Sequence, residues 1–446
     1  MRRDLTSRNS LGKPQPCEVF MTGNDMDTRD LEKTFPYLLL GGICSVRFFL
    51  NLAVQNYSIL IPVLQKDWGM SSAAAGSIVS AYQIGFLISL VGLSSLTDWV
   101  STKKVFLYSC VASAVSCVLF AFLARDYLSA LVLRGLMGLS MGGTYTPGLK
   151  LISEIFPSSF RGRAMGFFIG AGSLGLAGSV ALTGWTAARY GWQIALFAST
   201  LGPALGAVVP ALILRRMTEK RSRTEGIKFR KELLSNRPAL LMIAGYTAHV
   251  WELEGMRAWT PAFLVACFVA AGLTKDHAIS TGASLSSLIF FMGVFSTGIA
   301  GYLSDRLGRT TVIIATMVVS ITISFIFGWL IGGSMAWIII LGLTYGFAVI
   351  AESPVYSSGL SEVVPPNSLG TALGLRSLVG FGIGAIAPTV FGIVLDLTNP
   401  GGTTGDYVRI WGFAFAALGL VALAGPLAML KLRSMPESHH MAGGKK

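Results

Sequence analysis

The chain has 446 residues, of which 52% are hydrophobic and only 13% are charged, and its mean hydropathy is +0.63. So few charged side chains cannot cover the surface of two or three water-soluble domains, which excludes a soluble multidomain protein of this length. The formal net charge of +13 would suit a nucleic-acid-binding protein, so the positions of the basic residues must decide between that class and a membrane protein.

Apolar runs long enough to cross a bilayer recur along the whole sequence. They predict twelve membrane-spanning helices, over residues 36–64, 74–97, 104–124, 127–152, 164–187, 192–215, 239–270, 279–303, 310–332, 335–360, 369–395 and 408–431. The chain therefore divides into a cytoplasmic, disordered tail (1–34), a six-helix bundle (35–215), a basic cytoplasmic linker (216–238), a second six-helix bundle (239–433) and a cytoplasmic tail (434–446). The N-terminal tail lacks the apolar region of a signal peptide, and Met1, Met21 and Met26 are all possible starts.

The basic residues are distributed unevenly between the two sides of the membrane. Of the 35 Lys and Arg residues, 25 lie in the tails and loops on the side of the termini, five lie on the other side and five lie within spans. Cytoplasmic loops carry such an excess of basic residues. We therefore expect an integral multi-pass protein with both termini in the cytoplasm, and no nucleic-acid partner.

Residues 301–311 join two spans and read G-Y-L-S-D-R-L-G-R-T-T. This stretch resembles the loop signature G-x-x-x-D-R-x-G-R of the major facilitator superfamily. A weaker copy around Asp98 lies 207 residues earlier, and the segments 153–157 and 162–166 match 361–365 and 370–374 at an offset of 208. Matches in register indicate an internal duplication. The resemblance implies an all-α membrane protein of twelve helices in two pseudo-symmetric halves, which moves a small solute by alternating access.

The resemblance also implies that helices 5 and 11 face helices 8 and 2 of the opposite half. We expect Asp305 to act as a gating residue that contacts Arg161 and Arg163 while the cytoplasmic side is closed, where a helix N-terminus adds a favourable dipole. The other residues that we assign to gating are Asp98, Arg306 and Arg309.

Charged residues inside spans are the candidate functional residues, because each costs at least about 2.5–3.5 kcal/mol near the bilayer centre. Arg47 lies 11 residues into span 1, about 16 Å deep, and Asn51 and Gln55 share its helical face. We expect these three side chains to line a cavity and bind substrate, with a purely structural hydrogen-bond network as the alternative.

Span 7 carries two pairs of polar residues on nearly opposite faces. His249 and Glu252 form one pair, and Glu254 and Arg257 form the other. Only one pair can face a central cavity. We assign His249 and Glu252 to substrate binding, with Glu252 also in proton coupling, and we assign Glu254 and Arg257 to a structural ion pair.

Span 10 contains Glu352, with Tyr345 and Tyr356 on the same face. We assign all three to substrate binding and Glu352 also to proton coupling. Arg376 of span 11 lies at a similar depth, and a structural Glu352–Arg376 ion pair is as good an interpretation as a functional one. Arg134 begins the run R-G-L-M-G-L-S-M-G-G, which resembles the superfamily's helix-4 signature and so implies a part in proton movement.

The sequence contains no P-loop, and its four histidines lack metal-ligand spacing. We therefore expect no ATP, cofactor or metal site and no enzyme activity. The positive stripe on span 1 favours a small anionic or amphoteric solute, and the intramembrane carboxylates favour proton coupling. The alternatives are export of a cationic drug, transport of a metal ion or chelate such as iron, and a non-transporting membrane sensor or assembly partner. The solute, the direction of transport and the oligomeric state are not determined by these patterns.

Overall fold

A computed structural model describes residues 28–97, 99–156, 158–216, 231–365, 368–400 and 410–445. Within these residues the secondary structure is helical, without strands. Eleven segments are long and apolar enough to cross a membrane. The helix α5, whose 29 residues include Arg134 and Lys150, is the twelfth long helix in the same bundle. The predicted all-α membrane fold is confirmed.

The first six spans form the N-terminal half. Their helices are α1 (Thr28–Asn51) and α2 (Asn56–Asp67), α3 (Ser72–Leu96), α4 (Thr102–Leu123), α5 (Tyr127–Ile155), α6 (Ser158–Tyr190), and α7 (Trp192–Ser199) with α8 (Leu201–Ile213), which a short 3-10 turn, Leu214–Arg216, follows.

The last six spans form the C-terminal half, after the short helix α9 (Lys231–Ser235). Their helices are α10 (Arg237–Ala270), α11 (Lys275–Leu307), α12 (Arg309–Phe327) with the turn Gly328–Leu330, α13 (Met335–Val363), α14 (Leu369–Gly384) with α15 (Ala387–Thr398), and α16 (Gly412–Ala422) with α17 (Ala424–Arg433). A 3-10 segment, Pro436–Gly444, ends the described chain and contacts α13 through the bond from the Ala442 amide to Glu362.

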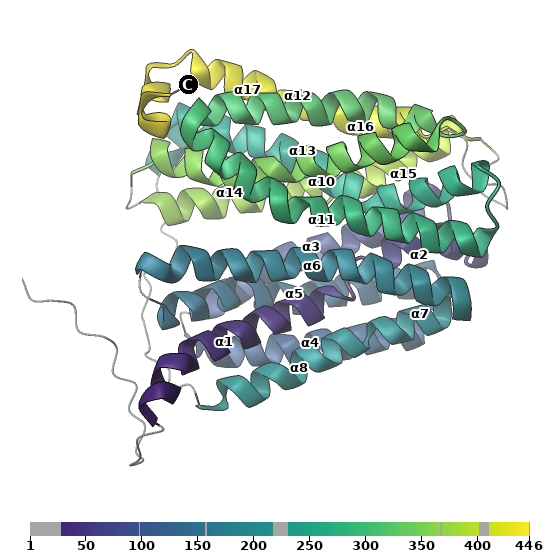
Figure 1. The fold of residues 1–446 in the computed structure, drawn as a ribbon, viewed down its shortest axis with the longest axis horizontal. Coiled ribbons are helices and arrows are strands. Elements are labelled where there is room, and N and C mark those ends of the chain that lie inside the picture. The colour runs from purple at the N-terminus through teal and green to yellow at the C-terminus, as the bar shows by residue number, and fades with distance from the viewer. Residues whose placement is uncertain are drawn as a thin grey trace, which may run out of the picture.

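The two halves lie side by side, with α1 to α8 in one layer and α10 to α17 in the other (Figure 1). Helix α6 packs against α11, and α15 packs against α3. Spans 5 and 11 therefore face spans 8 and 2, as the superfamily resemblance implied. The C-terminal segment lies at the left end of the bundle in Figure 1, and we call this end the terminal end and the opposite end the distal end.

The halves are joined at the distal end. The backbone amides of Ser72 and Ala73, at the start of α3, each donate a hydrogen bond of 2.8 Å to the carboxylate of Asp396 on α15. About two helical turns farther along, the hydroxyls of Ser80 and Thr389 share a hydrogen bond of 2.7 Å. The two halves therefore hold each other by polar contacts at this end.

Two glycines let the same helices approach closely. A Cβ on Gly76 of α3 would collide with the backbone of Pro388, and a Cβ on Gly392 of α15 would collide with the backbone of Ser72. Since both obstacles are backbone atoms, no side-chain movement could relieve them. The distal contact between the halves thus depends on small residues, as in other tightly packed membrane helices.

The structure changes some of the predicted boundaries. The first helix begins at Thr28, so it includes residues assigned to the N-terminal tail, and α9 lies within the predicted linker. The predicted tail up to residue 27, the linker residues 217–230 and Asp98 fall outside the described residues.

Candidate functional site

The first span is broken between α1 and α2, at residues 52–55. A helix break inside a membrane leaves backbone groups that need new partners. The carbonyl oxygen of Val54 accepts a hydrogen bond from Arg134 Nη2 at 2.9 Å, and the amide of Gln55 donates to the Ser179 hydroxyl at 3.1 Å. The Asn56 side chain donates to the Ser199 hydroxyl at 2.8 Å. Helices α5, α6 and α7 thus hold the break in place.

Arg134 is buried beside this break. Its Nη1 donates to the Asn56 side-chain oxygen at 3.2 Å, and its guanidinium lies 5.3–5.4 Å from the ring centroids of Tyr57, Tyr82 and Phe120. Through these contacts Arg134 acts as a structural clamp, which fixes the broken part of the first span against α5. The part in proton movement that the superfamily resemblance implies stays a prediction.

Arg47 lies on α1, one turn before the break. Its guanidinium lies 4.9 Å from the ring centroid of Tyr145 on α5 and 5.6 Å from that of Phe168 on α6. The Nε atom is buried without a hydrogen-bond partner, and among the described residues no carboxylate comes within 4.0 Å of this side chain. The residue is nevertheless partly exposed. An unpaired cation at this depth is costly, and an anion that reached it would relieve the cost.

The two amides on the same face of the first span have protein partners. Asn51 Nδ2 donates to the carbonyl oxygen of Gly172 at 3.2 Å, and Gln55 Nε2 donates to the carbonyl oxygen of Arg257, in the other half, at 3.4 Å. Of the three residues expected to bind substrate, the structural alternative therefore accounts for Asn51 and Gln55. Arg47 is the one with unused donors.

The face of α10 that carries His249 and Glu252 does not point at the interface between the halves, where we expected it. His249 and Glu252 are fully buried inside the C-terminal half. His249 Nδ1 lies 2.9 Å from Glu352 Oε2, and its Nε2 lies 2.6 Å from the Ser353 hydroxyl. Glu252 accepts a hydrogen bond of 2.9 Å from Ser320 on α12. His249 and Glu252 thus share a face of α10, as expected, but this face packs against α12 and α13 and not toward the other half.

The opposite face of α10 meets the N-terminal half. Glu254 and Arg257 form the expected ion pair at 3.5 Å, with side chains 14% and 21% exposed. Gln83 of α3 donates to Glu254 at 2.7 Å. The pair that we expected to point away from the interface between the halves is therefore the one that lies in it.

The expected Glu352–Arg376 ion pair is also absent from the described residues. Glu352 instead contacts His249, whereas Arg376 Nη1 donates to the Ser357 hydroxyl at 2.5 Å. The Arg376 guanidinium lies 4.2 Å from the ring centroid of Tyr246 on α10. The two charged side chains therefore have different partners, on α10 for Glu352 and on α13 and α10 for Arg376.

The two tyrosines that share a face with Glu352 belong to the core of the C-terminal half. Tyr345 donates to the Ser324 hydroxyl at 3.3 Å, and the Tyr356 hydroxyl lies 3.1 Å from the sulfur of Met317. Both are buried. Their assignment to substrate binding stays a prediction, without support from an exposed surface.

The gating residues form contacts within their own halves. Arg309 pairs with Asp305 at 2.5 Å and with Glu362 at 2.8 Å, and Arg306 lies 4.4 Å from the ring centroid of Tyr302. Arg161 donates to the Phe156 carbonyl at 3.5 Å, and Arg163 is exposed. The contact of Asp305 with these two arginines thus stays a prediction for a conformation in which the terminal end is closed.

Several interface residues escaped the sequence analysis. Gln83 could have been found, because an amide inside an apolar span invites the same question as Arg47. Tyr145 and Tyr246 gave no signal, since only their positions beside arginines distinguish them from other tyrosines. Asp396 lies at a span end, where an acidic residue is unremarkable in sequence.

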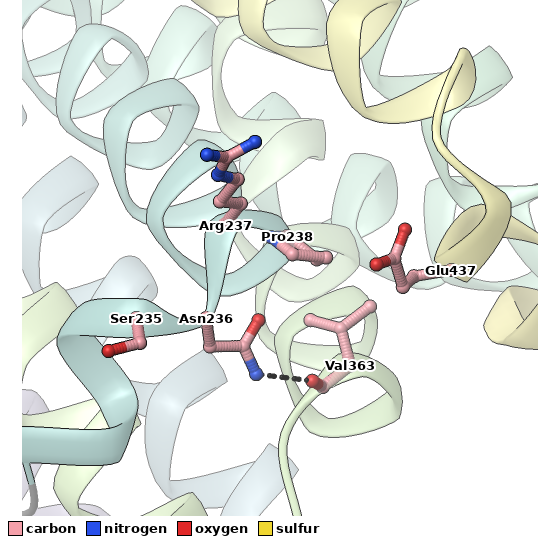
Figure 2. A pocket seen from close by; sticks show the side chains of 6 residues that line it. All are labelled: Ser235, Asn236, Arg237, Pro238, Val363 and Glu437. Carbon is pink, nitrogen blue, oxygen red and sulfur yellow. Dashed lines mark hydrogen bonds between the residues drawn. The ribbon is translucent and has the colours of Figure 1, made fainter.

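One pocket lies away from these charged residues, at the terminal end. Ser235, Asn236, Arg237, Pro238, Val363 and Glu437 line it (Figure 2). The Asn236 side chain donates to the Val363 carbonyl at 2.9 Å, so the pocket marks the place where α9, α10 and the end of α13 meet. Among the described residues, no three His, Cys, Asp or Glu side chains come together as a metal site would require.

Comparisons with known proteins agree with the fold and the loop signature. The sequence model of the Major Facilitator Superfamily matches residues 43–389 of this chain. A "Probable 4-methylmuconolactone transporter" of Cupriavidus pinatubonensis is 26% identical over 392 residues, which cover 83% of this chain and 86% of that protein. A "Probable sulfoacetate transporter" of Cupriavidus necator is 24% identical over 412 residues, with 87% and 92% covered.

A solved structure supports the same conclusion. The chain resembles a bacterial homologue of the human lysosomal transporter Spinster, in an inward-facing and occupied conformation, with a TM-score of 0.72 and 14% identity over 91% of this chain and 98% of that one. The family match covers most of the sequence, and the twelve described spans form the two expected halves. The chain therefore belongs to the Major Facilitator Superfamily and is a multi-pass membrane transporter rather than an enzyme.

Proposed function

We propose that this transporter carries a small organic anion and that Arg47 binds the anionic group. The observation that carries this proposal is the unpaired guanidinium of Arg47, held partly exposed beside the rings of Tyr145 and Phe168. A guanidinium suits carboxylate and sulfonate groups because its N–H donors can form two parallel hydrogen bonds. The rings keep it in place while leaving those donors unused.

The relatives support an anion over the other solutes. Sulfoacetate is itself an anion, and a muconolactone carries a carboxylic acid beside its lactone ring. A cationic drug or a metal cation would be repelled by Arg47. The proposal therefore places an organic acid ahead of a cationic drug or a free metal ion.

Alternating access is the second part of the proposal. The polar contacts described between the halves include a group at the distal end, around Ser72, Ser80 and Asp396. With the termini in the cytoplasm, as we propose, these distal contacts would belong to an inward-facing conformation. Rocking of the halves would break the distal group and let Asp305 reach Arg161 and Arg163 at the other end.

Proton coupling is the third part. His249, Glu252 and Glu352 are buried together in the C-terminal half, and His249 contacts Glu352 at 2.9 Å. A carboxylate buried this deeply is costly while it is negatively charged. A proton bound by one of these three residues would neutralise that charge. His249 and Glu252 lie on one face of α10, and Glu254 on the opposite face accepts a hydrogen bond from Gln83 of the other half. A proton bound inside the C-terminal half would therefore act on the same helix that contacts the N-terminal half.

Transport by the purified full-length protein in proteoliposomes tests all three parts. We expect saturable uptake of labelled sulfoacetate, inhibition by other organic acids, and faster uptake under a pH gradient of one orientation. Uptake that cationic drugs inhibit while organic acids do not would contradict the anion proposal. Anion uptake that is indifferent to pH gradients of both orientations would contradict proton coupling alone.

A further inference from the structure

Arg376, which the proposed function does not use, resembles Arg47 in its surroundings. Its Nε atom is also buried without a hydrogen-bond partner, and its guanidinium also lies beside a tyrosine ring, that of Tyr246. Within the described residues its one hydrogen-bond partner is the uncharged Ser357 hydroxyl, and no carboxylate lies within 4.0 Å. Like Arg47, it is partly exposed. Each half thus contains one unpaired arginine beside a tyrosine.

The two arginines lie at similar depths from the terminal end. Arg47 is 10 residues after Tyr37, where its span starts, and Arg376 is seven residues after Leu369. At a rise of 1.5 Å per residue, these positions lie about 15 Å and about 10 Å from the span ends. The two arginines therefore differ in depth by about one helical turn, so that one ligand between the halves could meet both.

Aromatic residues connect the two arginine–tyrosine pairs across the interface. Gly380 of α14, the residue before Phe381, lies directly against the Tyr246 ring. Phe86 of α3 lies between the halves, with ring centroids 6.5 Å from Tyr145 and 6.4 Å from Phe381 on α14. The pairs therefore belong to one continuous region at the interface.

We infer that Arg376 is a second anion-binding residue and that the substrate is a small organic acid with two acidic groups, one bound by Arg47 and the other by Arg376. A dicarboxylate or a sulfocarboxylate has this chemistry. Two charges in the membrane need two counter-charges, and an acid with one group leaves one arginine unpaired. This inference rests on the proposed function, because it uses Arg47 as the first anion-binding residue.

Binding to the purified full-length protein tests the inference with matched pairs of acids. Butyrate and succinate have the same number of carbons, but succinate has one more carboxylate. Acetate and sulfoacetate also have the same number of carbons, but sulfoacetate has an additional sulfonate. We expect the wild type to bind the diacid of each pair at least about tenfold more tightly, the usual gain from one well-placed charged contact. Arg376→Gln should remove this preference and leave the affinity for the monoacids within about twofold.

Two further variants separate binding from folding. Arg376→Lys keeps the charge and should keep part of the preference for diacids, even if the glutamine variant folds poorly. Arg189→Gln is the matched control, because Arg189 also lies beside an aromatic ring, 4.3 Å from the centroid of Trp185, but is exposed at the distal end of α6. This control should bind both acids of a pair like the wild type.

The failures of the two proposals are distinguishable. If Arg47→Gln weakens no anion, the proposed function is wrong and the inference falls with it. If Arg47→Gln weakens every anion but the wild type does not prefer diacids, the inference alone is wrong. Equal loss of monoacid and diacid binding in both Arg376→Gln and Arg376→Lys would also overturn it, because that result assigns Arg376 a structural role.

Discussion

The two halves of this transporter differ in the charges inside their spans. The spans of the N-terminal half contain Arg47 and Arg134 and have acidic residues only near helix ends, at Asp67 and Glu154. The spans of the C-terminal half contain three glutamates well inside their helices, Glu252, Glu254 and Glu352. The N-terminal half is thus positive inside the membrane, whereas the C-terminal half contains these carboxylates together with Arg257 and Arg376.

This difference shows what the internal duplication preserved. The halves share loop signatures and the six-helix arrangement, which depend on apolar length and on close contacts between helices. Their interior charges differ, as the proposed binding of an anion and a proton by different groups would require. A fold of two similar halves can in this way keep one arginine for an anion in each half and place the proton-binding groups in one half only, and the following predictions test that difference.

The largest effect should come from removing the unpaired cation of the N-terminal half. Arg47→Gln should reduce anion affinity about 100-fold, because a charged contact away from bulk water contributes about 2–5 kcal/mol. Binding of sulfoacetate to the purified protein measures the loss. Its thermal stability should stay near that of the wild type, since Arg47 has no hydrogen bond to the described protein. A variant that binds normally would remove the N-terminal half from anion recognition.

The other arginine of this half should behave in the opposite way. In Arg134→Gln the buried carbonyl oxygen of Val54 loses its charged hydrogen-bond donor. The free energy of unfolding should therefore fall by about 1–3 kcal/mol, the cost of one unsatisfied buried group. Thermal unfolding in detergent measures this change. If the variant unfolds like the wild type but loses the effect of a pH gradient, Arg134 is a proton-coupling residue and not a clamp.

The two faces of α10 supply a matched pair of variants in the C-terminal half. In the wild type we expect a pH gradient to change uptake about tenfold, a usual size for two coupled sites. Glu252→Gln should remove this effect. Glu254→Gln should keep that effect, because Glu254 is already paired with Arg257. Uptake measured with and without the gradient compares them. The reverse result would move proton coupling from the buried face of α10 to the face between the halves.

The smallest effect should come from the contact that joins the halves at the distal end. Asp396→Asn removes the charge that accepts the two amides of α3 and should weaken this closure by about 1 kcal/mol, or roughly fivefold in population. A cysteine in place of the exposed Ser284, near the distal end of α11, should report a change in labelling rate.

A matched control is available for this contact. Asp126 accepts the amide of Ser129 at 2.8 Å at the start of α5, so it has similar chemistry but joins residues of the same half. Asp126→Asn should leave the labelling rate unchanged. Equal changes in both variants would mean that the Asp396 contact only caps a helix and does not hold the halves together.

Much of the fold could be predicted from sequence because it depends on local properties. The length of an apolar run determines whether a helix can span the bilayer, and the repeat at 208 residues identifies two related halves. The same reasoning identified Arg47, since a charge inside an apolar run is costly wherever its side chain points. It also placed Glu254 and Arg257 at the correct spacing for an ion pair.

Only the tertiary structure decided which neighbours these residues meet. Helical periodicity puts Glu252 and Glu254 on different faces of α10, but it cannot say which face meets the other half. For the same reason it could not show that His249 contacts Glu352, or that Arg376 lies beside Tyr246 instead of Glu352. The rotation of each helix about its axis is set by packing against helices far away in the sequence, and that packing selects the partner of every buried charge.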